Sequence, residues 1–153
     1  MTIKSLYDCD EGGFFFLSHP YTHPDRATMR YRMIWMDKYA AALMNAGLSV
    51  YSPVAHNLGG IDDWIEGENV HEFELYREQN YGFLMQCDAM IVCRLPGWVE
   101  SPGVKDEVRF ILENCPETPI FSVDLYAMEI TPTEVEASND GILEWALGGK
   151  AKD

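Results

Sequence analysis

The feature that most constrains the fold is one uninterrupted apolar run near the middle of the chain. Between Asp88 and Leu95 the residues Ala-Met-Ile-Val-Cys follow one another without any polar alternation. A strand with one exposed face alternates between polar and apolar residues, whereas a strand covered on both faces is apolar throughout. The run therefore predicts a central strand in a sheet that has helices on both sides.

Three further strands are predicted from short apolar runs that end at proline or a polar residue. They cover residues 14–17, 48–52 and 119–123. Between these runs, apolar residues recur at helical spacing. The predicted helices span residues 26–46, 72–86 and 104–114, with a last helical segment from residue 131 toward Trp145.

Local signals set the predicted ends of these elements. Asp25 is a suitable N-cap for the first helix, and Gly47 is a suitable stop. Gly82 predicts an interruption of the second helix, residues 131–134 have the form of a capping box, and residues 56–67 look irregular. The alternation of strands and helices favours a three-layer α/β sandwich with a mainly parallel sheet of about five strands.

Length and composition indicate one ordinary globular domain. The chain has 153 residues, of which 47% are apolar and 24% charged, and it contains no internal repeat. We therefore expect a single domain over residues 1–153. The four cysteines form no C-x-x-C pair and are expected to be reduced thiols. The start of the chain has no signal-peptide pattern and no apolar run reaches membrane-spanning length, so a cytoplasmic protein is expected.

The charge balance limits the classes of partner. A formal charge of −14, from 25 acidic and 11 basic residues, disfavours a surface that neutralises many phosphates of a nucleic-acid polymer. A small anionic ligand is still compatible, because a helix N-terminus can hold a phosphate through backbone N–H groups. A stripe of Met29, Met33 and Met36 in the first helix indicates either core packing or a contact between subunits.

In sheets of this type, ligands bind outside the carboxyl ends of the strands. Three loops there supply candidate substrate-binding residues: Ser18, His19, Tyr21 and Arg26, then His56, then Trp98, Ser101 and Gly103. Simpler interpretations stay open, since Tyr21 and Trp98 also suit a core or an interface and His56 also suits a turn. His19 and His23 have a spacing that suggests a metal, but their prolines and the missing carboxylate argue against zinc.

Glu107 is the candidate nucleophile. Ser101 precedes a predicted helix and Glu107 lies in its first turns. A phosphate near Ser101 would meet the helix N-terminus, and a carboxylate in the same place can form an ester with a sugar. Read in isolation, Glu107 is an ordinary exposed helix residue and Ser101 is only an N-cap.

Two blocks of the sequence are similar to the nucleoside 2-deoxyribosyltransferase-like family, which includes nucleotide N-hydrolases. The first block is Phe16-Leu-Ser-His-Pro-Tyr-Thr-His-Pro-Asp-Arg26 followed by Gly47-Leu-Ser-Val-Tyr-Ser-Pro53, and the second runs from Cys87-Asp-Ala-Met-Ile-Val-Cys93 to Gly97-Trp-Val-Glu-Ser-Pro-Gly-Val-Lys-Asp-Glu107. The chain looks closest to a bacterial and phage branch of unknown function. The resemblance spans about residues 13–124 and leaves 125–153 as a C-terminal extension.

This resemblance implies a flavodoxin-like, Rossmann-like sheet, a homo-oligomer of two or more subunits, a catalytic role for Glu107 and a phosphate contact for Ser101. The family usually has an aspartate eight residues before the aspartate of the central strand. Counting back from Asp88 reaches Asn80. An asparagine can orient a hydroxyl but cannot deliver a proton at neutral pH. Asp62, Asp63 or Glu78 are candidate substitutes.

The sequence therefore predicts an enzyme that cleaves or transfers the N-glycosidic bond of a nucleoside or nucleoside monophosphate, with no cofactor and no metal. Hydrolysis and transfer differ only in the final acceptor. A catalytically silent nucleotide-binding module is the alternative, because of Asn80. A dinucleotide-binding protein is a weaker possibility, since no G-x-G-x-x-G follows the first predicted strand.

Overall fold

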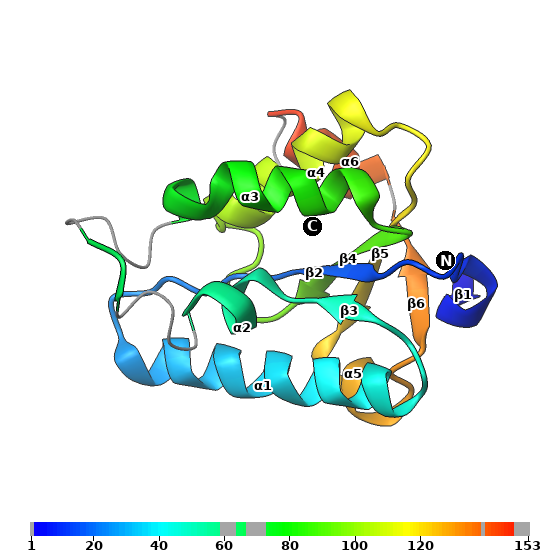
Figure 1. Cartoon of the computed structure of the whole chain (residues 1–153), viewed down its shortest axis with the longest axis horizontal. Coiled ribbons are helices and arrows are strands. Elements are labelled where there is room, and N and C mark those ends of the chain that lie inside the picture. Colours follow the sequence, from blue (N-terminus) through cyan, green and yellow to red (C-terminus); the bar gives the residue numbers. More distant parts are fainter. Residues whose placement is uncertain (1, 59–63, 67–72, 139, 149–153) are drawn as a thin grey trace.

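The computed structural model describes residues 2–58, 64–66, 73–138 and 140–148, and shows one six-stranded sheet with helices on both faces (Figure 1). The strands are β1 (Ile3–Ser5), β2 (Phe15–Ser18), β3 (Val50–Tyr51), β4 (Ala89–Arg94), β5 (Ile120–Asp124) and β6 (Glu134–Ala137). The helices are η1 (Leu6–Cys9), α1 (Arg26–Asn45), α2 (Pro53–Leu58), α3 (Phe73–Gln86), α4 (Pro102–Asn114), α5 (Leu125–Ile130) and α6 (Asp140–Ala146). The predicted α/β class is therefore confirmed.

The sheet is mixed, so the prediction of a mainly parallel sheet with about five strands is wrong. The strand order is β1-β6-β5-β4-β2-β3. Strands β5, β4, β2 and β3 run parallel to one another, whereas β6 runs antiparallel to β5 and β1 antiparallel to β6. The segment around residues 131–134 does not open a helix. It leads into β6, where Val135 is buried and Glu136 accepts a hydrogen bond from Arg94 at 3.1 Å.

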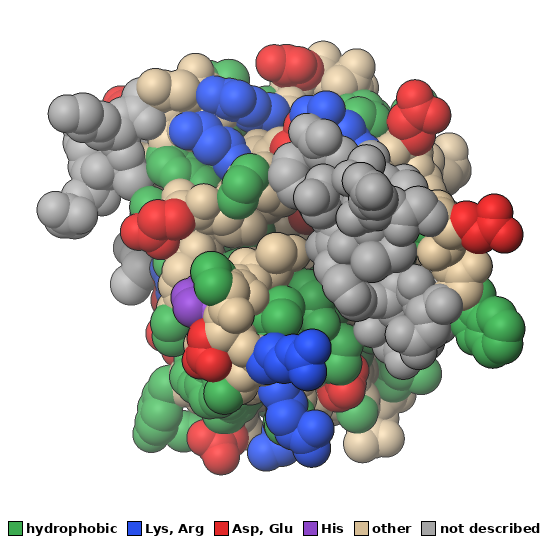
Figure 2. All heavy atoms as spheres, turned by 90° about the vertical axis from the view of Figure 1, so that its left-hand side faces the viewer, with side chains coloured by type: hydrophobic (Ala, Val, Ile, Leu, Met, Phe, Trp, Pro, Cys, Tyr) green, Lys and Arg blue, Asp and Glu red, His purple; other side chains and the backbone are tan. Residues whose placement is uncertain are grey.

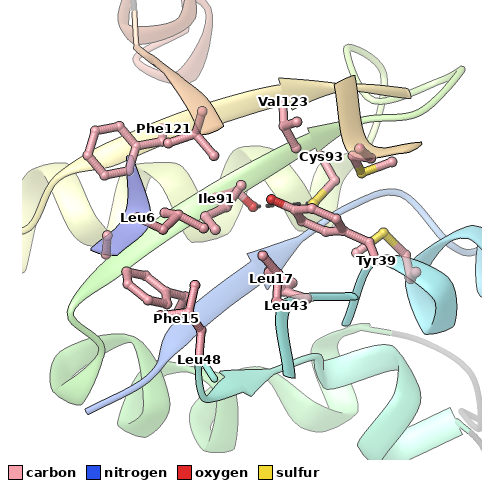
Figure 3. Packing of buried hydrophobic residues seen from close by; sticks show 14 of the residues in the cluster. Leu6, Phe15, Leu17, Tyr39, Leu43, Leu48, Ile91, Cys93, Phe121 and Val123 are labelled. Carbon is pink, nitrogen blue, oxygen red and sulfur yellow. Dashed lines mark hydrogen bonds between the residues drawn. The ribbon is translucent and has the colours of Figure 1, made fainter. Parts of the chain in front are cut away.

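Each face of the sheet has its own apolar cluster. On one face, odd-numbered residues of β2 and β4 pack against Met36, Tyr39 and Leu43 of α1. Figure 3 shows Leu17 and Ile91 on the same side of the sheet as α1. On the other face, even-numbered residues of the same strands pack against α3, α4 and α6. Burial on both faces explains why the central run is apolar at every position.

Helix α1 begins and ends as predicted. The Asp25 side chain accepts hydrogen bonds from the N–H groups of Ala27 and Thr28, which satisfies donors that a helix start leaves free. Gly47 follows the helix with a φ of +87°, a conformation that favours glycine. Of the predicted methionine stripe, Met36 is buried in the core cluster on this face, whereas Met29 and Met33 are partly buried.

Two further local predictions are wrong. Helix α3 continues through Gly82 without interruption, because one helical glycine costs only about 1 kcal/mol and Leu84 is fully buried one half-turn later. Residues 53–58, part of which looked irregular, form the short helix α2. The four cysteines are free, and Cys87 and Cys93 are buried. Within the described ranges, no helix combines the length and apolar character that crossing a bilayer demands.

Candidate functional site

One pocket lies at the carboxyl ends of β2 and β4, on the left of Figure 1. The connection from β2 leads outward to β3 and the connection from β4 leads the opposite way to β5, so these two strands form the point at which the chain order reverses. Ligands of doubly wound sheets bind at such points. The pocket has a volume of about 710 Å³, within the range of small-molecule sites.

Glu107 lies in this pocket with only 8% of its surface exposed. Val104, Val108 and Ile111 are buried on the same face of α4 and direct that face toward the sheet. On β2, Phe16 and Ser18 point to the same side, and Ser18 is the last residue of the strand. Strand alternation and helical spacing thus bring Ser18 and Glu107 together.

Both carboxyl oxygens of Glu107 have a polar neighbour. The Ser18 hydroxyl donates a hydrogen bond to Oε1 at 2.7 Å, and the Asn80 side-chain amide donates a longer one to Oε2 at 3.4 Å. Burial raises the pKa of Glu107 to about 8, while the Ser18 hydrogen bond lowers it and the negative charge of Asp106 raises it. The carboxyl group is therefore mostly protonated at neutral pH in the free protein.

Asp106, next to Glu107 in α4, belongs to a polar cluster that joins α4 to α3. Arg77 donates from Nη2 to Asp106 Oδ1 at 2.5 Å and from Nε to Oδ2 at 3.2 Å. The Tyr81 hydroxyl donates to the same carboxylate at 2.7 Å, and its ring stacks on Phe110 at 4.1 Å. Because Tyr81 follows Asn80, this cluster holds the Asn80 amide opposite Glu107.

The N-terminus of α4 forms another part of the wall. Ser101 caps the helix, since its Oγ accepts a hydrogen bond from the Val104 N–H at 3.3 Å. Pro102 has no N–H, and the Gly103 N–H has no partner among the described residues. Ser101 and Gly103 both line the pocket. The Ser101 hydroxyl proton and the Gly103 N–H are thus donors available to an anion.

The structure brings together most of the predicted site residues. His19, Tyr21, Asn80, Ser101, Gly103 and Glu107 line the pocket, and Ser18 contacts Glu107 directly. Arg26, His56 and Trp98 are not in the lining. Arg26 and His56 are exposed, and Trp98 packs edge-to-face on Trp145 at 5.5 Å.

The candidate proton donors do not enter the pocket within the described part of the chain. Glu78 is exposed on α3 and is not part of the lining, whereas Asp62 and Asp63 lie outside the described residues. His19 does line the pocket. Its Nδ1 is 2.9 Å from the Pro20 carbonyl oxygen, and burial lowers the pKa of His19 to about 4, so the ring is neutral at neutral pH. In the described ranges, no group of three potential metal ligands occurs.

Sequence reasoning missed Arg32, and it selected His56 as a binding residue in preference to its neighbour Asn57. Arg32 lines the pocket with 6% of its surface exposed, and it donates hydrogen bonds to the carbonyl oxygens of Tyr21, Thr22 and Pro96. The signal for it was present, because Arg32 lies between Met29 and Met36 on the apolar stripe of α1. Asn57, beside the predicted His56, is the member of that pair that points inward.

Unsatisfied polar atoms concentrate in this pocket. Four buried side-chain atoms of lining residues have no hydrogen-bond partner within the described structure: His19 Nε2, Arg32 Nε, Asn57 Nδ2 and Asn80 Oδ1. Buried polar atoms are nearly always paired in native proteins, and exceptions call for an explanation. Their accumulation around one cavity indicates a site adapted to a polar ligand.

Comparison with known families places the chain in a family. The model of a family described as "Domain of unknown function (DUF1937)" matches residues 13–123, which include every lining residue of the pocket. No curated protein matches the chain. The family description names no reaction, so the resemblance to nucleoside 2-deoxyribosyltransferases stays a prediction.

Proposed function

We propose an activity for this chain, which belongs to the DUF1937 family, a domain of unknown function. From its pocket, we infer that it cleaves or transfers the N-glycosidic bond of a nucleoside or nucleoside monophosphate. The observation that carries the proposal is Glu107, a carboxyl group buried at the carboxyl end of β2, with a hydroxyl and an amide on its two oxygens. A side chain so placed is exposed to ligand and shielded from bulk water.

The proposed reaction has two steps. Ionised Glu107 attacks the anomeric carbon, the bond to the base breaks, and the base departs with the electron pair. Water or a second base then attacks the same carbon and releases Glu107 as a carboxylate, and the proton that this acceptor loses balances the proton that the departed base takes up. Ser18 and Asn80 orient the carboxylate through their hydrogen bonds. Hydrolase and transferase differ only in which acceptor enters, and the reaction as written needs no cofactor.

The ionisation state of Glu107 gives this mechanism a pH signature. A nucleophilic carboxylate must be deprotonated, and the pKa of Glu107 is about 8 in the free protein. The value of kcat/KM is therefore expected to rise with pH and to level off above about 8. A general acid at the same position would give the opposite profile, with kcat/KM falling through that pH.

A 5′-phosphate fits the wall formed by α4. The Ser101 hydroxyl and the Gly103 N–H are donors at the start of a 13-residue helix. If a phosphate accepts hydrogen bonds from these donors, monophosphates are the substrates. If a neutral sugar hydroxyl accepts them, free nucleosides are the substrates. The flavodoxin-like assignment and the expected homo-oligomer also stay proposals.

A catalytically silent nucleotide-binding module is the second candidate. Two observations favour it: Asn80 offers no proton to a departing base, and Glu107 is mostly neutral at pH 7. A neutral glutamic acid can donate a hydrogen bond to a ligand and remain unreacted. Such a module would bind nucleotides tightly and release no base.

Chromatography of free base decides between these candidates. The native chain, Glu107→Ala and Glu107→Gln are incubated with nucleosides and nucleoside monophosphates, with and without an acceptor base. Glu113→Gln is the matched control, because Glu113 is an exposed residue of the same helix. We expect base release from the native chain and the control, and loss of about a thousandfold or more in both Glu107 variants. Nucleotide binding without base release by the native chain would select the silent module.

A further inference from the structure

Arg32 is a buried cation that joins the two loops at the mouth of the pocket. Its Nη1 donates to the carbonyl oxygens of Tyr21 and Thr22 at 3.1 and 3.2 Å, in the loop after β2. Its Nη2 donates to the Pro96 carbonyl oxygen at 3.0 Å, in the loop after β4. The guanidinium is therefore held in one place by backbone oxygens of both loops.

These contacts leave part of the guanidinium without a partner. An arginine has five N–H donors in a planar arrangement. Nη1 has an acceptor for each of its N–H groups, Nη2 has one acceptor, and Nε has none among the described residues. The unused donors are thus on Nε and Nη2, which share one edge of the guanidinium. That edge matches the two oxygens of a carboxylate or phosphate group.

The positive charge of Arg32 is also uncompensated. In the described part of the chain, Arg32 forms no ion pair, whereas Arg77 and Arg94 each pair with a carboxylate. Burial lowers the pKa of Arg32, which reflects the cost of keeping a cation away from water. An anionic ligand group beside it would offset that cost.

The surroundings of Arg32 are built closely around it. Gly97 has a φ of +93°, and a Cβ atom there would clash with Arg32 Nη2, so the backbone of the loop after β4 lies directly against the guanidinium. His19, whose pKa is lowered partly by the charge of Arg32, contributes another unpartnered atom, Nε2. Arg32, Gly97 and His19 all line the pocket.

The surface around the carboxyl ends of the strands carries both basic and acidic side chains. Figure 2 shows this side of the molecule, where lysine and arginine side chains gather in two groups, above and below the centre of the face. The chain as a whole carries a formal charge of −14. Basic side chains on this face reduce the repulsion that an approaching anion would otherwise meet.

We propose that the free edge of the Arg32 guanidinium binds an oxyanion of the ligand, so that the pocket selects phosphate- or carboxylate-bearing ligands over neutral ones. This inference rests on the proposed function only in its choice of nucleotides as probes. In that setting, the expected ligand is a nucleoside monophosphate, and Arg32 adds a charge-assisted contact to whatever donors α4 supplies.

Calorimetric titration tests the proposal. Each of the four 2′-deoxynucleosides and its 5′-monophosphate is titrated into the native protein, with inorganic phosphate and acetate as separate probes of the anion alone. A charge-assisted contact predicts that at least one monophosphate binds about 10- to 100-fold more tightly than its nucleoside. Equal affinity of nucleosides and monophosphates for the native protein would overturn the proposal without any variant.

Variants then assign the preference to Arg32. Arg32→Gln removes the charge, and Arg32→Lys keeps the charge but removes the edge with two donors. Arg30→Gln is the matched control, because Arg30 is an exposed arginine of the same helix. We expect the preference for monophosphates to disappear in Arg32→Gln, to shrink in Arg32→Lys and to persist in Arg30→Gln. If it persists in folded Arg32→Gln and disappears in Ser101→Ala, the anion binds at α4 and the proposal is wrong.

Two safeguards separate this inference from folding and from the proposed function. Circular dichroism reports whether Arg32→Gln is folded; if it is not, Arg32→Lys and the comparison within the native protein decide. Glu107-dependent release of base from nucleosides and monophosphates at equal kcat/KM would support the proposed function and overturn this inference. Thermal stabilisation by inorganic phosphate that requires Arg32, without base release from any substrate, would support the inference and overturn the proposed function.

Discussion

The two faces of the sheet are built from the same strands but carry different side chains near the carboxyl ends of those strands. On the α1 face, β2 and β4 meet an apolar layer, and the buried hydroxyl of Tyr39 donates to the Pro132 carbonyl oxygen at 3.1 Å. On the α4 face, the apolar layer ends at the carboxyl end of β2 in a polar group of Ser18, Asn80 and Glu107. The first face is apolar along β2 and β4, whereas the second carries a buried carboxyl group at its edge.

This difference indicates that the apolar layer on the α1 face mainly contributes stability, whereas the α4 face supplies the candidate nucleophile Glu107. Apolar packing on the α1 face contributes free energy of folding that depends little on pH. The buried carboxyl of Glu107 makes the free energy of folding depend on pH, because its ionisation inside the protein is costly. Substitutions on the two faces should therefore affect different observables.

The largest effect is expected from Leu43→Ala on the α1 face. Leu43 is fully buried, and removal of a buried leucine side chain lowers the free energy of unfolding by about 2–5 kcal/mol. Urea denaturation measures the loss, with Met44→Ala as the control, since 63% of Met44 is exposed. Ligand binding per folded molecule should be unchanged, and a loss of binding in folded Leu43→Ala would contradict the separation of roles.

The next largest effect is a gain of stability in Glu107→Gln at alkaline pH. Because the folded pKa of about 8 lies above that of an unfolded glutamate, the folded state holds a proton that the unfolded state has lost between about pH 4.3 and 8. The native protein therefore loses stability as pH rises through this window, and the glutamine variant does not. We expect a gain of several kcal/mol at pH 9 and none at pH 4.

Thermal unfolding at pH 4, 7 and 9 measures this gain, with Glu113→Gln on the exposed part of α4 as the control. Parallel curves for the native protein and Glu107→Gln at all three pH values would show that the carboxyl is not buried as described.

A smaller effect is expected from Ser18→Ala. The Ser18 hydroxyl stabilises the ionised form of Glu107, so its removal should raise the pKa of Glu107 above about 8. Carbon-13 NMR of the glutamate carboxyl group reports the shift without any need for activity. Ser122→Ala is the control, because Ser122 is a buried serine of β5 that makes no contact with Glu107 in the described structure. A shift of the Glu107 pKa of the same size in Ser122→Ala would mean that the effect of Ser18→Ala does not come from the lost hydrogen bond.

The smallest effect, with the opposite sign, is expected from Asp106→Asn. The negative charge of Asp106 raises the pKa of Glu107, so its removal should lower that pKa. Arg77→Met should act the other way, since it leaves the Asp106 charge unpaired. The pH dependence of base release and the carboxyl NMR titration both measure the change. Shifts of equal sign in the two variants would mean that they act by moving α3 and not through charge.

The sequence predicted the elements that are held by local or strongly periodic signals. β4 has its apolar run, α1 has the Asp25 cap, and α4 has Ser101 with an apolar stripe behind it. The antiparallel strands β1 and β6 have no such signal. β1 has three residues, and β6 carries two glutamates that resemble a solvated segment until Glu136 meets Arg94 across the sheet. That pairing is set by residues far apart in sequence.

The candidate site shows the same division. Glu107, Asn80 and Ser101 were predicted to act together, and all three line the pocket. His56 was selected from the same segment as Asn57, and the rotation of α2 turns Asn57 inward. Arg32 was missed because a single arginine within an apolar stripe looks like an exposed exception. Its place becomes evident only when two loops supply carbonyl oxygens to it.

The pairing of β1 with β6 has a consequence for biosynthesis. Ile3 lies opposite Glu136, and Ser5 lies opposite Glu134, so β1 leaves the ribosome long before its neighbour exists. β2, β3 and β4 can meet earlier, since their partners are closer in sequence. Until β6 emerges, the outer edge of β5 is open and can pair with another nascent chain. Closure of this edge is therefore the last step in the assembly of the sheet during translation.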